Sequence, residues 1–252
     1  MGLLHALSLY AQQHLGLSIT RAGKEYRAQE RYVLRRSLAA FEIDCVFDVG
    51  ANSGQFADLV RESGFKGPIV SFEPVPELAA GLRRRAAGRR DWFVEELALD
   101  ERVHDVEFHV MSMTQFSSLL RPSTKETASQ SRLNTVSKTI QVTTGTLEAA
   151  FDKYQRRVGF RRPFLKMDTQ GKDVDVARGA GDRLQQFAAI MTELAVKRLY
   201  DGQPDFRQAL EFYFDQGFEV AAMLPTHPHF PQMIEVDCVL HNPALTDRPQ
   251  AS

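Results

Sequence analysis

The stretch VFDVGANSG, residues 46–54, joins an apolar run to an aspartate and to a turn that contains Gly50 and Gly54. The apolar run begins at Ile43, is too short for a helix, and is typical of a strand buried on both faces of a sheet. The segment SGQFADLVRESGF, residues 53–65, then repeats apolar residues at helical spacing. The sequence therefore predicts a strand, a glycine-rich turn and a helix.

The same alternation of strand and helix continues along the rest of the chain. Apolar runs predict strands at residues 68–73, 92–99, 105–110, 163–168 and 187–196. Helical spacing predicts helices at residues 76–88, 147–154, 174–180 and 206–218. Two last strands, FEVAAML and MIEVDCVLH, suit a hairpin. This order predicts an α/β fold with a Rossmann-like, doubly wound, mostly parallel sheet and an antiparallel C-terminal edge strand.

The chain divides into three parts by its sequence patterns. Residues 1–41 predict an N-terminal helical extension of two amphipathic helices, which we expect to cover the pocket or to pair with a second subunit in a homodimer. Residues 42–245 predict one Rossmann-like domain, and residues 246–252 a flexible tail. Residues 112–146 are rich in Ser and Thr and predict a long loop, which in a compact domain is functional or disordered.

Composition excludes several classes of protein. Lys and Arg number 31 and Asp and Glu number 32, so the formal charge of -1 argues against a nucleic-acid-binding protein. The first twenty residues have no basic start and no apolar stretch of about 18 residues, so neither a signal peptide nor a membrane span is expected. Cys45 and Cys238 lie inside apolar runs, which indicates buried free thiols and a cytoplasmic protein.

The glycine turn fits neither of the common phosphate-binding motifs. A strand that enters such a turn places a ligand at the carboxyl edge of the sheet, against backbone N–H groups and a helix N-terminus. A dinucleotide fingerprint needs G-x-G-x-x-G, but positions 50, 52 and 55 are Gly50, Asn52 and Gln55. A phosphate-binding Walker loop needs a lysine and a hydroxyl residue that the turn lacks.

Two acids follow the first two predicted strands and indicate another ligand. Glu73 ends the second strand, where a carboxylate accepts hydrogen bonds from both hydroxyls of a ribose. Asp48, at the end of the first strand, could face a cationic group on the same ligand. Each acid alone also suits a turn or an N-cap. Together they favour a positively charged nucleoside without phosphate, and S-adenosylmethionine is such a molecule.

Several blocks of the sequence, between about residue 43 and about residue 242, resemble one family. The blocks are VFDVGANSGQF, FEPVPE, FSSLL, FLKMDTQGKDVDVARGA and LYDGQPDF. They resemble the FkbM family of class I, Rossmann-like, S-adenosylmethionine-dependent methyltransferases. Lys172 and Asp173 depart from the pattern, because many relatives have an aromatic or apolar residue and a glutamate there. Residues 1–40 match nothing in it.

The resemblance implies which residues surround the cofactor. It implies that Glu73 holds the ribose, that Pro74 and Val75 flank the adenosine, and that Asp168 lies beside the sulfonium, facing both cofactor and acceptor. It places the methionyl part and the ribose against Asp48, Gly50, Asn52 and Gly54, and the adenine near Ala98 and Leu99.

Methyl transfer to an alcohol needs alignment of the oxygen with the methyl group and removal of a proton. Candidates after the fourth and fifth strands of the sheet are Lys166, Asp168, Gln170 and Glu193. Asp168 is the first choice, as the general base or as one ligand of a divalent metal such as Mg²⁺, with a helix N-cap as the alternative. Lys166 could polarise the acceptor or form an ion pair. Glu193, in an apolar strand, needs a partner or a function.

The resemblance predicts an O-methyltransferase that acts on a hydroxyl of a sugar, a glycolipid or a secondary metabolite. Ser117 and Ser118 could contact this acceptor or form an ordinary turn. His227 and His229 lie in a loop that could reach the site or be ordinary surface. Two alternatives are an NAD(P)-dependent or nucleotide-sugar oxidoreductase on a Rossmann fold, and a non-catalytic methyltransferase-like interaction protein. The failed dinucleotide motif counts against the first, and the retained acids count against the second.

Overall fold

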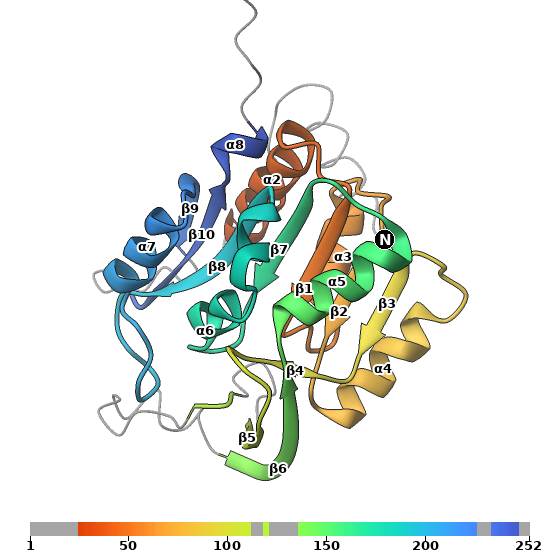
Figure 1. The fold of residues 1–252 in the computed structure, drawn as a ribbon, viewed down its shortest axis with the longest axis vertical. Coiled ribbons are helices and arrows are strands. Elements are labelled where there is room, and N and C mark those ends of the chain that lie inside the picture. Colours follow the sequence, from red (N-terminus) through yellow and green to blue (C-terminus); the bar gives the residue numbers. More distant parts are fainter. Residues whose placement is uncertain (1–24, 112–117, 121–135, 226–232, 247–252) are drawn as a thin grey trace, which may run out of the picture.

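The computed structural model describes residues 25–111, 118–120, 136–225 and 233–246 (Figure 1). Among these residues, seven strands form the main sheet in the order β3-β2-β1-β7-β8-β10-β9. The strands are β1 (Cys45–Val49), β2 (Ile69–Phe72), β3 (Trp92–Glu95), β7 (Pro163–Met167), β8 (Ala189–Ala195), β9 (Glu219–Pro225) and β10 (Glu235–His241). Pairing from β3 to β8 is parallel, whereas β10 is antiparallel to both β8 and β9. The predicted fold class is therefore confirmed.

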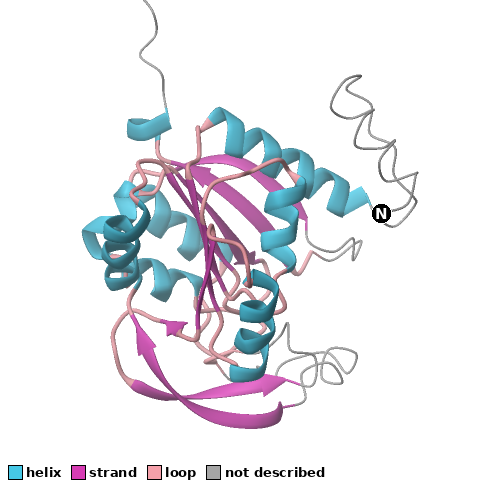
Figure 2. Cartoon of the chain, turned by 90° about the vertical axis from the view of Figure 1, so that its right-hand side faces the viewer, coloured by secondary structure: helices cyan, strands magenta, loops and turns pink. Residues whose placement is uncertain are grey.

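Helices cover both faces of this sheet, which Figure 2 shows edge-on. One face packs against α2 (Glu25–Ala40), α3 (Gln55–Glu62) and α4 (Pro76–Ala86). The other packs against α5 (Leu147–Val158), α6 (Asp173–Arg178), the 3-10 helix η2 (Gly181–Gln186) and α7 (Phe206–Asp215). A short helix, α8 (Pro243–Thr246), follows the last strand. The structure is a three-layer sandwich whose two cores lie on opposite sides of β1 and β7.

The central strands explain why the sheet is stable. Every residue of β1 and of β7 is buried, as the continuous apolar runs predict. The ring of Phe47 lies 5.4 to 6.3 Å from those of several other aromatic residues, in stacked and edge-to-face contacts. Cys45 and Cys238 are buried free thiols, as predicted.

A second, smaller sheet corrects two predictions. It consists of β4 (Ala98–Leu99), β5 (Asp105–Met111) and β6 (Val136–Gly145). The predicted strand 92–99 is divided between β3 and β4, which belong to different sheets. The predicted loop 112–146 contains the ten-residue strand β6, which pairs antiparallel with β5. Its residues are mostly polar and exposed, so long-range pairing, more than a buried apolar face, defines the strand.

The N-terminal helix α2 lies against the domain core. Leu34 and Leu38 on α2 are buried together with Val46, Phe164 and Val239 of the sheet. The other predicted N-terminal helix lies in residues 1–24, outside the described residues, as do residues 247–252 of the predicted tail. The three-part division of the chain stays a prediction. No helix within the described ranges has both the length and the apolar character needed to cross a bilayer.

Candidate active site

The turn after β1 is a tight backbone loop that meets the end of β7. Gly50, Asn52 and Gly54 all have positive φ, at 76°, 48° and 88°. The backbone N–H groups of Gly50 and Ala51 both donate to the carbonyl of Phe72 at the end of β2. A Cβ on Gly50 would lie 2.0 Å from the backbone oxygen of Asp168, so only glycine fits. The turn is therefore held between β2 and the segment after β7.

The conformation of Asn52 explains why an asparagine replaces the middle glycine of the dinucleotide motif. Asparagine adopts left-handed backbone conformations more readily than most residues. In this conformation the Asn52 N–H donates to Oε2 of Glu73 over 2.8 Å. The residue that argued against a dinucleotide site thus connects the turn to the acid after β2.

Glu73 is held so that both of its carboxylate oxygens keep capacity for a ligand. Oε1 accepts a hydrogen bond from the Val75 N–H at 2.9 Å, while Oε2 accepts from Asn52. Each oxygen has a second lone pair. The side chain is only 5% exposed, and burial raises the pKa of Glu73 to about 7 although both backbone N–H groups lower it. Pro74 is half-buried and Val75 is buried beside it.

Asp48 lies beneath the turn and forms an internal ion pair. Its side chain is 0% exposed, its Oδ2 accepts from Ser71 Oγ at 3.1 Å, and its Oδ1 lies 3.5 Å from the ammonium nitrogen of Lys166. Lys166 also donates to the carbonyl of Gly50 at 3.3 Å. In the structure, then, the cation that Asp48 meets is Lys166, and the predicted contact with the cofactor stays a prediction.

Lys166 joins Asp48 to Asp168, the predicted base. The Lys166 nitrogen lies 3.5 Å from Asp168 Oδ2, and burial would lower the pKa of Lys166, but Asp168 and Asp48 raise it above its usual value. The Asp168 side chain is 44% exposed, unlike the buried acids around it. The alternative that Asp168 caps a helix does not hold, because α6 begins at Asp173 with Lys172 at its N-cap. Asp168 is thus an accessible carboxylate beside a buried cation.

Asp173 holds the turn after β7 against β8. Its Oδ1 accepts from the backbone N–H and the hydroxyl of Thr169 at 2.9 and 2.5 Å. Its Oδ2 accepts from the Thr192 hydroxyl at 2.9 Å and the Glu193 N–H at 3.1 Å. All four bonds go to protein groups, so Asp173 fixes the positions of Asp168 and Glu193.

Glu193 faces other acids across the β8–β10 pairing. It lies directly opposite Asp237, and Glu235 is two residues away on the same face of β10. Like charges in such cross-strand pairs are destabilising. Burial raises the pKa of Glu193 well above its usual value, and burial also raises the pKa of Glu235 and that of Asp237 to about 7. The Tyr26 hydroxyl of α2 donates to Asp237 Oδ2.

Replacing Asp237 with asparagine is expected to stabilise the protein at pH 8 and to have little effect near pH 4. The folded-state pKa of about 7 exceeds the ordinary value of 3.8, so the folded state retains this proton while the unfolded state loses it. Stability therefore falls as pH rises from about 4 to 7, and asparagine mimics the protonated acid. Chemical denaturation at both pH values should show a gain on the order of 2 kcal/mol at pH 8 only.

The matched control for this change is Asp205→Asn. Asp205 is the half-buried N-cap of α7, where asparagine is also a good cap, so the change in stability caused by Asp205→Asn should differ little between the two pH values. An Asp237→Asn protein that is equally or less stable than the unchanged protein at pH 8 would show that Asp237 imposes no cost when it is ionised.

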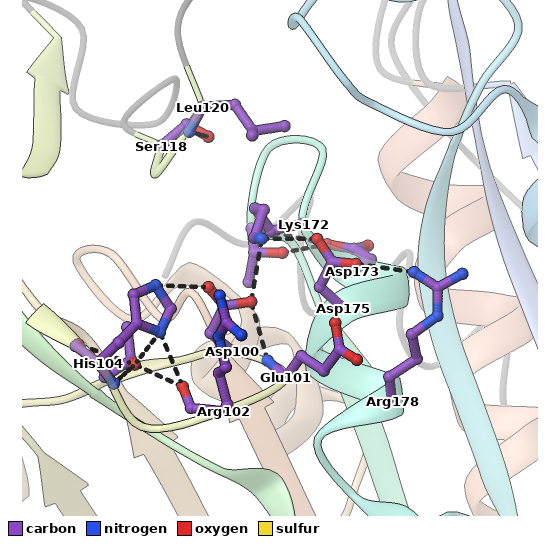
Figure 3. Close-up of polar contacts among 12 residues, drawn as sticks. Asp100, Glu101, Arg102, His104, Ser118, Leu120, Lys172, Asp173, Asp175 and Arg178 are labelled. Carbon is purple, nitrogen blue, oxygen red and sulfur yellow. Dashed lines mark hydrogen bonds and ion pairs between the residues drawn. The ribbon is translucent and has the colours of Figure 1, made fainter. Parts of the chain in front are cut away.

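The predicted adenine segment lies beside a different ion-pair network. Ala98 and Leu99 are buried in β4. Asp100, the next residue, lies between Lys172 and His104 (Figure 3). Its Oδ1 is 3.0 Å from the Lys172 nitrogen, and its Oδ2 is 3.6 Å from His104 Nε2. Lys172, a departure from the family pattern, thus binds the end of β4 to the start of α6.

The remaining candidates differ in their placement. Ser118 is fully buried, and its hydroxyl donates to the backbone carbonyl of Gln170 at 2.8 Å, so its side chain serves the fold. Ser117, His227 and His229 lie outside the described residues. No cluster of three or more His, Cys, Asp or Glu that could hold a metal ion occurs within the described part of the chain.

Three residues beside this site, Tyr26, Glu235 and Asp237, were not predicted from the sequence. Glu235 and Asp237 alternate with apolar residues on a strand next to Glu193, and that alternation was a readable signal. Tyr26 had no such signal, because helical spacing does not say which strand end a residue will meet. The structure therefore adds the start of α2 and the strand β10 to the predicted positions.

The site thus combines a glycine turn, an acid after β2 and an accessible acid after β7, at the carboxyl edge of a class I sheet. Residues 48–220 match the family model described as a methyltransferase FkbM domain. The chain belongs to the FkbM methyltransferase family. The match includes Asp48, Glu73, Asp168 and Glu193, whereas α2 and β10 lie outside it.

One curated relative of this FkbM-family chain is the 2-O-methyltransferase NoeI of Sinorhizobium fredii (strain NBRC 101917 / NGR234). The two are 26% identical over 208 residues, which are 79% of this chain and 80% of the relative. The methyltransferase FkbM of Methylobacillus flagellatus KT is 12% identical, with 93% of this chain and 59% of that chain covered and a TM-score of 0.48. Magnesium protoporphyrin IX methyltransferase (ChlM) of Synechocystis PCC 6803, solved with bound SAM, is 10% identical, with 94% and 96% covered and a TM-score of 0.45.

Proposed function

We propose that this enzyme transfers a methyl group from S-adenosylmethionine to a hydroxyl of a sugar, a glycolipid or a secondary metabolite. The observation that carries the proposal is the accessible carboxylate of Asp168, which follows β7 and touches the glycine turn through its own backbone. The turn and Glu73 form the cofactor half of the site, and Asp168 is the group placed to act on the acceptor. The 2-O-methyltransferase relative supports oxygen as the methyl-accepting atom.

The residues at the turn fit S-adenosylmethionine. Both oxygens of Glu73 can accept one more hydrogen bond, which suits the two hydroxyls of a ribose. The turn has no Walker lysine, in agreement with a nucleoside that carries no phosphate. The proposed cofactor positions also include Gly50, Asn52 and Gly54 in the turn, and Pro74, Ala98 and Leu99 further along the chain. When bound, the cofactor supplies an electrophilic methyl group on a sulfonium.

Charge around Asp168 favours an acceptor without negative charge near its reacting hydroxyl. Negative charge on Asp168 raises the pKa of surrounding carboxyl groups from α2, β1, α6, β8 and β10. An anionic group placed among these acids would be repelled. This supports a neutral glycan or small-molecule hydroxyl as acceptor, and it argues against a nucleic-acid backbone.

In the proposed mechanism Asp168 accepts the proton of the acceptor hydroxyl as the oxygen approaches the methyl group. General bases of this kind typically contribute about 10² to 10⁴ to the rate. Lys166 ion-pairs with Asp168 Oδ2 and holds it beside the turn. Glu193, the third predicted catalytic residue, is half-buried and acts on the position of Asp168 through Gln170, which donates to both acids.

A divalent metal such as Mg²⁺ is the alternative to a base. Within the described residues, no group of three or more His, Cys, Asp or Glu side chains that could hold a metal ion supports it.

A homodimer also stays a prediction. The helix α2, which was expected to cover the pocket or to pair with a second subunit, packs against the sheet of its own chain. Cytoplasmic localisation is supported by the buried free thiols of Cys45 and Cys238.

Titration calorimetry tests the cofactor and separates this proposal from its alternatives. S-adenosylhomocysteine should bind with a micromolar Kd or tighter, about -8 kcal/mol, and NAD should give no heat. Transfer of labelled methyl to a panel of neutral glycans, phosphorylated sugars and hydroxylated metabolites should label the neutral compounds. Heat with NAD but not with S-adenosylhomocysteine would identify an oxidoreductase instead, and binding of neither would favour the non-catalytic alternative.

A further inference from the structure

Gln170 occupies a constrained position between the two acids nearest the proposed methyl-accepting space. It follows Asp168 by two residues and is only 7% exposed. Its φ of 53° is positive, and Gly171 after it also has a positive φ of 96°. Left-handed backbone at a residue other than glycine is uncommon and needs surrounding contacts to maintain it. The side chain of Gln170 is therefore directed by the fold toward a definite place.

The amide of Gln170 bridges two carboxylates. Its Nε2 donates to Asp168 Oδ1 at 2.8 Å and to Glu193 Oε2 at 3.2 Å. The amide nitrogen has two N–H groups, and both are used by this arrangement. Hydrogen bonds that a carboxylate accepts are among the stronger ones in proteins. The bridge thus fixes the rotamer of Asp168 and leaves its Oδ2 for Lys166 and the acceptor.

The orientation of the amide is set from its other end. The hydroxyl of Tyr200 donates to Gln170 Oε1 at 2.9 Å, which assigns Nε2 to the side of the acids. Tyr200 is buried, and Gln203 Oε1 accepts from the backbone N–H groups of Leu199 and Tyr200 at 2.9 and 3.3 Å. The segment after β8 is thereby tied to the turn after β7.

The backbone of Gln170 is held by a third segment. Its carbonyl accepts from the Ser118 hydroxyl at 2.8 Å, and Ser118 exchanges two backbone hydrogen bonds with His109 of β5. Leu120 lies against Gly171, where an added Cβ would be 3.0 Å from its side chain (Figure 3 labels Ser118 and Leu120). Three segments that are distant in sequence therefore converge on one glutamine.

Charge explains why a glutamine is suited to this place. The ionisable groups whose charge interacts with Asp168 come from α2, β1, β7, α6, β8 and β10: Glu30, Asp48, Lys166, Asp173, Glu193 and the pair Glu235 and Asp237. A neutral donor between Asp168 and Glu193 satisfies both acids without adding another charge. A glutamate would place a third carboxylate there, and an apolar residue would leave both oxygens without this donor.

We propose that Gln170 is a positioning residue for methyl transfer, which fixes the Asp168 carboxylate through its amide, and that Tyr200 acts through Gln170. The inference rests on the proposed role of Asp168. It assigns a function to the buried glutamine and to the Tyr200 segment that the site otherwise leaves unexplained.

The test compares Gln170→Met, Tyr200→Phe and the double variant in the full chain. With a labelled acceptor from the panel, Gln170→Met should lower kcat about tenfold while the KM for S-adenosylmethionine changes less than about twofold. Tyr200→Phe should lower kcat less. The double variant should be no slower than Gln170→Met, because Tyr200 acts through the amide that is already absent. Additive losses in the double variant would overturn the role given to Tyr200.

A spectroscopic arm needs no acceptor. With ¹³C-labelled aspartate, the Asp168 carboxyl resonance, assigned by its absence in Asp168→Asn, should move in Gln170→Met at constant pH. The matched control Gln155→Met changes an exposed glutamine on α5 whose Nε2 bonds a backbone carbonyl, and it should leave that resonance in place. An unmoved Asp168 resonance in a folded Gln170→Met protein would overturn the proposal. A moved resonance together with a fully active Asp168→Asn protein would instead refute the proposed base and leave the bridge intact.

Discussion

An Asp168→Asn protein is expected to transfer methyl groups at least about 100-fold more slowly while binding S-adenosylhomocysteine within about twofold of the unchanged affinity. The carboxamide has the size of the carboxylate and still accepts from Gln170 Nε2 through its oxygen, so the turn should keep its shape. It has no basic oxygen for the hydroxyl proton. The loss should therefore appear in kcat rather than in cofactor binding.

Initial rates at saturating acceptor and cofactor, together with calorimetry, measure this expectation. The matched control is Asp182→Asn, which makes the same change at an exposed residue of η2 and should leave both quantities unchanged. Full turnover in Asp168→Asn would mean that another group removes the proton. Activity that disappears with EDTA and returns with magnesium would support the metal alternative for Asp168.

Glu73→Ala should weaken S-adenosylhomocysteine binding about 100-fold. Two hydrogen bonds from ribose hydroxyls to a charged acceptor are each on the order of 1.5 kcal/mol, and the change also removes the partner of the Asn52 and Val75 N–H groups. The measurement belongs at pH 8, because the pKa of about 7 makes Glu73 ionised there. Calorimetry at this pH gives the affinity directly.

Two further variants define what a loss in Glu73→Ala means. Glu77→Ala removes a carboxylate one turn away that pairs with Lys138 on the surface, and it should bind as the unchanged protein does. Glu73→Gln keeps the shape of the side chain but is a weaker hydrogen-bond acceptor. Its affinity for S-adenosylhomocysteine should therefore lie between that of Glu73→Ala and that of the unchanged protein. Equal affinity in all of these proteins would remove Glu73 from the cofactor site, whatever its effect on folding.

Local pattern was sufficient for the core of the fold. The runs around Phe47, Phe164 and Ile190 are apolar on both faces because helices cover both sides of the sheet. A strand of this kind can be predicted from a continuous run of apolar residues. The acid Glu73 at the end of β2 follows from the same local reading. These features were predicted because each depends on a few neighbouring residues.

Features that depend on distant pairing were not predicted. The strand β6 is made of Ser, Thr and other polar residues, and it exists because β5 is its neighbour. The ion pair between Asp48 and Lys166 was also not predicted, because it depends on the strand register that places the two residues opposite each other. Tyr26 donates a hydrogen bond to Asp237, which is more than two hundred residues away in the sequence. The periodicity of a local segment cannot predict such a contact.

The contact between Gly50 and the carbonyl of Asp168 has a consequence for how such an enzyme can change over time. A single methyl group at position 50 would collide with the backbone of Asp168, the proposed base, so a substitution of Gly50 would require the segment after β7 to move. Variation that alters the acceptor is therefore expected to accumulate outside these two segments. We therefore expect the glycine turn and the segment that carries Asp168 to change together.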